Sequence, residues 1–98
     1  MNEMVALSEA EIEARLKSHT EWVLQDNKLY RRVIFADFVQ AFGFMTQVAL
    51  VAEKINHHPE WSNVYRTVEM YLTTHDAGGI SQLDFELLEE IERLIGTQ

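Results

Sequence analysis

The hydrophobic period of this chain changes from that of a helix to that of a strand across its only proline, Pro59. Before the proline, apolar residues recur at spacings of three and four, as on one face of a helix: Phe38, Phe42, Met45, Ala49 and Ala52. After it, apolar and more polar residues alternate over 67–73, as in a strand with one buried face. Proline disfavours helical geometry in the preceding residue, so the helix should end near Asn56. The fold must therefore combine helices with a sheet.

Local signals predict the other helices. A serine followed three positions later by an acidic residue is a capping box, and two of these predict helices over about 8–18 and 81–95. Asp37 is placed to cap the long central helix. We expect the Phe38–Phe42–Met45 stripe of that helix to lie in the core, and Gly43 to mark a close packing contact.

Two pairs of strands are predicted. Segments 22–25 and 29–35 are rich in strand formers, and Asp26-Asn27 between them suits a tight hairpin turn. The region 61–74 reads as two strands with a bend at Asn63. The element order is then helix, two strands, helix, two strands, helix. This order predicts an α+β fold: one two-layer domain over 1–98, with three helices packed on one face of a four-stranded antiparallel sheet.

Composition narrows the classes of function. Eight Lys and Arg against sixteen Asp and Glu give a net charge of −8, which disfavours direct nucleic-acid binding and anionic membrane surfaces. No apolar run approaches the roughly 20 residues of a membrane span, and residues 1–10 lack the pattern of a signal peptide. The absence of cysteine fits a reducing compartment. We therefore expect a cytoplasmic protein.

Three of the four histidines lie in turn-like segments. His57 and His58 follow the central helix, and His75-Asp76 precedes a Gly-Gly pair. Histidine suits proton transfer near neutral pH, so these loops could form an acid–base site together with Trp61 and nearby carboxylates. His19 shows no partner pattern and is expected on the surface.

Each of these features also has a purely structural interpretation. The His-His-Pro segment could be a solvated helix cap, His75-Asp76 a plain turn, Trp61 a core anchor and Asp84 only a capping residue. A metal site is disfavoured, because adjacent histidines point apart and no His-x-x-x-His pair occurs.

The second half of the chain contains an ordered pattern made of the segments Glu53–Trp61, Asn63–Tyr65 and Leu72–Gly79, followed by Asp84. This pattern resembles that of the pterin-4a-carbinolamine dehydratase family. In that family an acidic residue precedes His-His-Pro, and an aromatic residue, a histidine and an aspartate follow. The residues in register are Glu53, His57, His58, Pro59, Tyr65, His75 and Asp84.

The resemblance implies a hydro-lyase that removes water from 4a-hydroxytetrahydropterin without a cofactor, giving quinonoid dihydropterin and recycling the pterin. It implies that His57 and His75 exchange protons with the substrate while His58 positions it. Supporting and substrate-binding roles are implied for five further residues: Glu53 and Asp84 orient the histidines, and Pro59, Trp61 and Asp76 contact the pterin.

The resemblance also implies a homodimer or homotetramer. This expectation agrees with the small core and with a second strand, 29–35, that carries apolar groups on both faces. Some family members act as dimerisation cofactors of a vertebrate homeodomain transcription factor. A non-catalytic module that binds a protein partner is therefore the alternative function.

Overall fold

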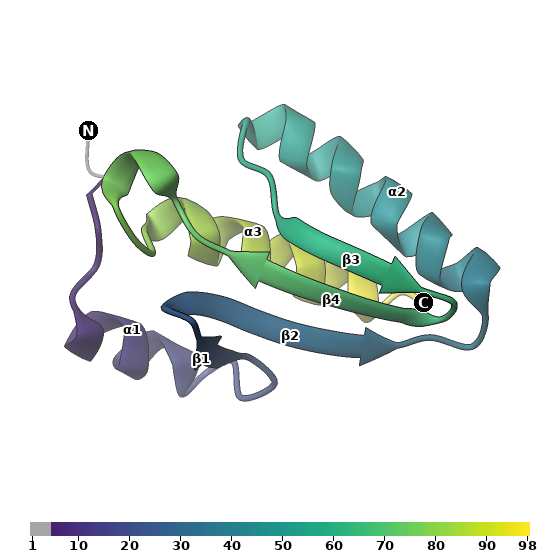
Figure 1. The fold of residues 1–98 in the computed structure, drawn as a ribbon, viewed down its shortest axis with the longest axis horizontal. Coiled ribbons are helices and arrows are strands. Elements are labelled where there is room, and N and C mark those ends of the chain that lie inside the picture. The colour runs from purple at the N-terminus through teal and green to yellow at the C-terminus, as the bar shows by residue number, and fades with distance from the viewer. Residues whose placement is uncertain (1–4) are drawn as a thin grey trace.

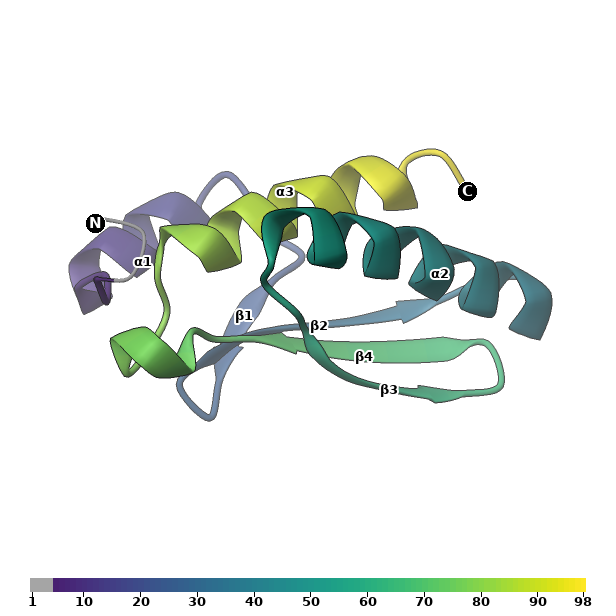
Figure 2. The same ribbon diagram turned by 90° about the horizontal axis from the view of Figure 1, so that it is seen from above.

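In the computed structural model, which describes residues 5–98, three helices lie on one face of a four-stranded antiparallel sheet (Figures 1 and 2). The elements in chain order are α1 (Glu9–Leu16), β1 (Val23–Gln25), β2 (Lys28–Ile34), α2 (Phe38–Ile55), β3 (Glu60–Val64), β4 (Thr67–Leu72), the short 3-10 helix η2 (His75–Ala77) and α3 (Gln82–Ile95). The strands lie in the order β1-β2-β4-β3. The predicted α+β fold is confirmed. Residues 1–4, part of the N-terminal segment considered above, lie outside the described residues.

The predicted turn and helix caps are confirmed. Asp26 and Asn27 both have positive φ, 54° and 60°, as a tight hairpin turn requires. The Asp37 side chain accepts a hydrogen bond from the Gln40 amide at 2.8 Å and so caps α2. At α1, the Glu11 carboxylate accepts the Ser8 amide at 2.8 Å.

The turn between β3 and β4 falls later than predicted. Asn63 lies within β3, and the chain reverses at Tyr65, which has a φ of 53°. The Asn63 side chain instead supports the turn, donating to the Tyr65 and Thr67 carbonyls at 3.0 Å each. The prediction was wrong because asparagine stabilises a turn through its side chain as readily as through its own backbone.

The buried face of α2 differs from the predicted one. Ala41, Phe44 and Val48 are fully buried, whereas Phe38 and Phe42 are about half exposed. Of the predicted stripe, only Ala52 is buried, and Met45 is partly buried against the core. A Cβ atom added at Gly43 would meet nothing within 4 Å, so Gly43 makes no close packing contact with the described residues of its own chain. The helix is apolar around most of its circumference, and its period therefore did not identify the face that packs on the sheet and on α3.

The sheet face away from the helices is more polar. Tyr30 and Tyr71 lie opposite each other on β2 and β4, with ring centroids 4.8 Å apart. The Tyr30 hydroxyl donates to Glu69 Oε2 at 2.6 Å, and this bond raises the pKa of Tyr30 to about 12. Within residues 5–98, no helix is long and apolar enough to cross a bilayer.

Candidate active site

Two chain reversals meet at one end of the sheet (Figure 1). Helix α2 ends at Asn56, whose left-handed conformation (φ 54°, ψ 45°) turns the chain back toward β3. Strand β4 ends nearby and continues into η2. The Thr74 amide donates to the Gly79 carbonyl at 2.9 Å and closes the η2 loop, with Gly78 at a φ of 76°. These backbone features place the histidine segments at the same rim.

A cavity of about 460 Å³ lies between the two reversals. Its volume is within the range of small-molecule sites, roughly 300–1,000 Å³. The lining residues come from the α2–β3 connection, the β4–η2 segment and α3: Ile55, Asn56, His57, His58, Thr73, Thr74, His75, Asp76 and Leu83. The structure thus brings His57, His58, His75 and Asp76 to one cavity.

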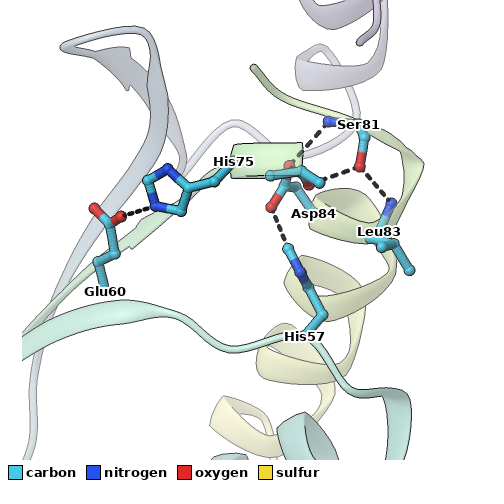
Figure 3. Close-up of polar contacts among 7 residues, drawn as sticks. His57, Glu60, His75, Ser81, Leu83 and Asp84 are labelled. Carbon is cyan, nitrogen blue, oxygen red and sulfur yellow. Dashed lines mark hydrogen bonds and ion pairs between the residues drawn. The ribbon is translucent and has the colours of Figure 1, made fainter. Parts of the chain in front are cut away.

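His57 is held by a buried carboxylate (Figure 3). Its Nε2 lies 2.6 Å from Oδ1 of Asp84, which is 0% exposed. The second oxygen, Oδ2, accepts the Thr74 hydroxyl at 2.7 Å and the Ser81 amide at 2.9 Å. A buried carboxylate with all these partners is fixed in place, and it fixes the imidazole in turn.

A short chain of hydroxyl groups supports this carboxylate. The Thr74 hydroxyl gives its single proton to Asp84, so the 2.7 Å contact between Thr74 Oγ1 and Ser81 Oγ must use the Ser81 proton. Ser81 Oγ accepts the Leu83 amide at 3.2 Å (Figure 3). Asp84 therefore both caps α3 and contacts the candidate site.

His58 and His75 also pair with carboxylates, but near the surface. His58 Nε2 lies 2.6 Å from Glu53 Oε2, and His75 Nε2 lies 2.8 Å from Glu60 Oε2. Glu60 Oε1 in turn accepts Lys28 Nζ at 2.6 Å. The Lys28 hydrogen bond, helped by that of His75, lowers the pKa of Glu60.

Pro59, Trp61 and Glu53 do not line this cavity among the described residues. Trp61 is partly buried and packs against the hydrophobic core, and Glu53 reaches the site through His58. Tyr65, which lies in register in the family pattern, is at the turn that follows β3, whereas the cavity borders the segment that precedes this strand.

The residues at the site that were missed in the sequence include three that hydrogen-bond its side chains, Lys28, Glu60 and Thr74, and four others that line the cavity, Ile55, Asn56, Thr73 and Leu83. Glu60 and Thr74 lie inside the segments that carry the resemblance, next to predicted site residues, and that proximity was the available signal. Lys28 gave no such signal, because it lies 32 positions from Glu60 and meets it only through the sheet.

The arrangement suits proton transfer. Each Nε2 faces a carboxylate, so in a neutral ring Nε2 carries the proton and Nδ1 the lone pair. Three such imidazoles around one cavity provide groups that can donate or accept protons near neutral pH. Within residues 5–98, no group of three His, Asp or Glu side chains is arranged to hold a metal ion.

Comparison with known proteins identifies the family. The family model described as pterin 4 alpha carbinolamine dehydratase matches residues 5–94. A protein of Solibacter usitatus is 52% identical over 88 residues, covering 90% of this chain and 93% of its own, and one of Prochlorococcus marinus is 59% identical over 73 residues, covering 74% and 76%. Both bear the name "Putative pterin-4-alpha-carbinolamine dehydratase". This chain belongs to the pterin-4a-carbinolamine dehydratase family.

A solved structure supports the same assignment. The crystal structure of a transcriptional coactivator/pterin dehydratase from Brucella melitensis superimposes with a TM-score of 0.88 at 38% identity. The match covers 91% of this chain and 97% of that one.

Proposed function

We propose that this protein is a 4a-hydroxytetrahydropterin dehydratase that recycles oxidised pterin. The observation that carries the proposal is the placement of His57, His58 and His75 around one cavity, each paired with its own carboxylate. Family membership supports the same reaction. A reducing, cytoplasmic setting is part of the proposal and agrees with the cysteine-free composition.

The chemistry requires one acid and one base. The C4a–O bond of the substrate breaks, a C4a=N5 double bond forms and water leaves. Hydroxide is a poor leaving group, so an acid must give a proton to the hydroxyl oxygen while a base accepts the proton from N5. In this proposal His57 and His75 perform these two transfers, and the net result moves one proton from one imidazole to the other.

The remaining residues orient these groups and the substrate. Asp84 holds the His57 ring, and Glu53 holds His58, which positions the pterin. Asp76 lines the cavity and is available to hydrogen-bond the pterin ring. Pro59 and Trp61 remain predicted substrate contacts, although the cavity is lined by other residues.

The decisive experiment is an absorbance assay for quinonoid dihydropterin, with the spontaneous dehydration in buffer subtracted. Replacing His57 or His75 by alanine should lower kcat by about 10²–10⁴-fold, the usual contribution of a general acid or base. His19→Ala is the control, because His19 pairs with Glu92 away from this cavity. Unchanged turnover in both variants would refute the assignment.

We also propose that the protein is a homodimer or homotetramer. The outer face of α2 exposes Val39 (79%), Phe42 (56%) and Leu50 (70%). A shallow cavity of about 290 Å³ lies beside Phe38, Val39, Phe42 and Gly43. Clustered apolar side chains of this kind are typical of an interface.

The same face of α2 supports a second candidate function, a module that binds a protein partner. The name of the Brucella melitensis protein joins a transcriptional coactivator to a pterin dehydratase. The dehydratase assay separates the two candidates. A wild-type protein that forms an oligomer but does not accelerate dehydration would favour the binding module.

A further inference from the structure

His75 is the least constrained of the three imidazoles. Its side chain is 79% exposed, against 53% for His58 and 11% for His57. It belongs to η2, a helix of three residues, and so lacks the rigid support that a long helix or a sheet provides. A proton-transfer group that is this exposed needs some other contact to fix its orientation and tautomer.

Glu60 provides that contact from an edge strand. Its Oε2 lies 2.8 Å from His75 Nε2 (Figure 3), and its Oε1 accepts Lys28 Nζ at 2.6 Å. Both carboxylate oxygens are therefore engaged. Glu60 begins β3 and Lys28 begins β2, and β4 lies between these strands, so the contact crosses the sheet.

Lys28 is positioned by the β1–β2 hairpin. It directly follows Asp26 and Asn27, whose left-handed conformations fix the turn, and it pairs with Gln25 across the hairpin. Another cavity, of about 260 Å³, lies between this turn and the η2 loop and is lined partly by His75. The imidazole thus lies between the cavity that contains His57 and a cavity on the hairpin side.

We infer that Lys28 and Glu60 are positioning residues for His75: Lys28 holds the Glu60 carboxylate, and Glu60 accepts the Nε2 proton and leaves Nδ1 as the atom that exchanges a proton. The catalytic meaning of this inference rests on the proposed dehydratase function. The hydrogen-bonded contact itself does not depend on the substrate.

Lys28 also counters the charge of Glu60, because its ammonium nitrogen lies 2.6 Å from Oε1. The other titratable groups lining the two cavities beside His75 are His57, His58, Asp26 and Asp76.

Nuclear magnetic resonance of histidine-labelled protein tests the inference without substrate. Nitrogen shifts of the rings report the tautomer of His75, with His57 as an internal reference. In Glu60→Gln we expect a larger fraction of the tautomer protonated at Nδ1, because an amide can donate to Nε2 as well as accept from it. In Lys28→Met we expect a smaller shift toward the same mixed tautomer population, because the Glu60 carboxylate loses the contact that fixes its orientation, and Lys28→Arg should restore the single tautomer.

A double variant tests whether Lys28 acts through Glu60. In the Glu60→Gln background, the effect of Lys28→Met on His75 should be largely lost. An equal effect in both backgrounds would overturn the role given to Lys28. An unchanged tautomer in Glu60→Gln would overturn the whole inference. Glu13→Gln, which removes the charge of an exposed carboxylate on α1, is the control for the change in net charge.

Kinetics then distinguish this inference from the proposed function. Glu60→Gln should lower kcat about 10- to 100-fold, the range for residues that orient a functional imidazole, with little change in KM. An inactive wild type would refute the dehydratase proposal, while the resonance data would still decide the positioning of His75. Full activity in Glu60→Gln would contradict the positioning role alone.

Discussion

Asp84 Oδ1 lies 2.6 Å from His57 Nε2, although the two residues are 27 positions apart in the chain. The same carboxylate accepts the Ser81 amide at the start of α3. One buried group thus connects the start of a core helix to an imidazole at the candidate site. Changes at this residue should therefore affect both stability and turnover.

Asp84→Asn should lower the free energy of unfolding by about 1–3 kcal/mol, since it removes a charged acceptor from a buried, fully paired position. Turnover should also fall, because an amide that donates to Nε2 would favour the other tautomer of His57. Chemical denaturation and the dehydratase assay measure the two effects. Glu11→Gln is the matched control: it weakens the α1 capping box without contact to His57, so turnover should not change.

Thr74→Val should lower stability by about 1–2 kcal/mol, because it leaves Asp84 Oδ2 with one donor fewer in a buried position. Thr74→Ser keeps the hydroxyl and should retain most of that stability. Denaturation midpoints of the two variants, compared at equal m-values, give the difference. Equal midpoints would show that the hydroxyl contributes nothing to holding Asp84.

The Tyr30–Glu69 bond should stabilise the fold at neutral pH and be lost in alkali. Because the pKa of Tyr30 is raised to about 12, the folded state holds its proton more tightly than the unfolded state. This contribution is complete below about pH 10, the ordinary pKa of tyrosine. It falls as pH rises through 12. Phenolate absorbance should show Tyr30 ionising at lower pH in Glu69→Gln, and Tyr30→Phe identifies its share of the signal.

Phe42→Glu should weaken self-association if the exposed face of α2 joins two copies of the chain. Burying one phenylalanine contributes about 1.5–3 kcal/mol, so the dissociation constant should rise at least about tenfold. Sedimentation velocity over a range of concentrations measures it. Phe42→Leu, which keeps the site apolar, should associate nearly as the wild type does. A Phe42→Glu protein with wild-type mass at all concentrations would exclude this face as the interface.

The local features of the fold, which depend on residues close together in the chain, could be predicted from the sequence alone. Three examples are the Asp26-Asn27 turn, the Asp37 cap and the alternation in β4. Each depends on neighbours within about four positions, so the spacing and type of the residues are enough to predict it. Pro59 and the Gly78-Gly79 pair likewise placed three histidines in turn-like segments at the ends of elements. Those features follow from short-range hydrogen bonding and periodicity.

Only the tertiary structure decided which groups meet. Helix α2 carries apolar residues on both faces. The face that contains Phe44 packs against the sheet and α3, and the face that contains Phe42 is exposed. The partners of His57 and His75 were likewise settled by the fold, as was the reach of Lys28 across the sheet to Glu60. Such contacts depend on the register of the strands and the packing of the helices, which bring together residues far apart in the chain. These long-range contacts produce no periodic pattern in the sequence.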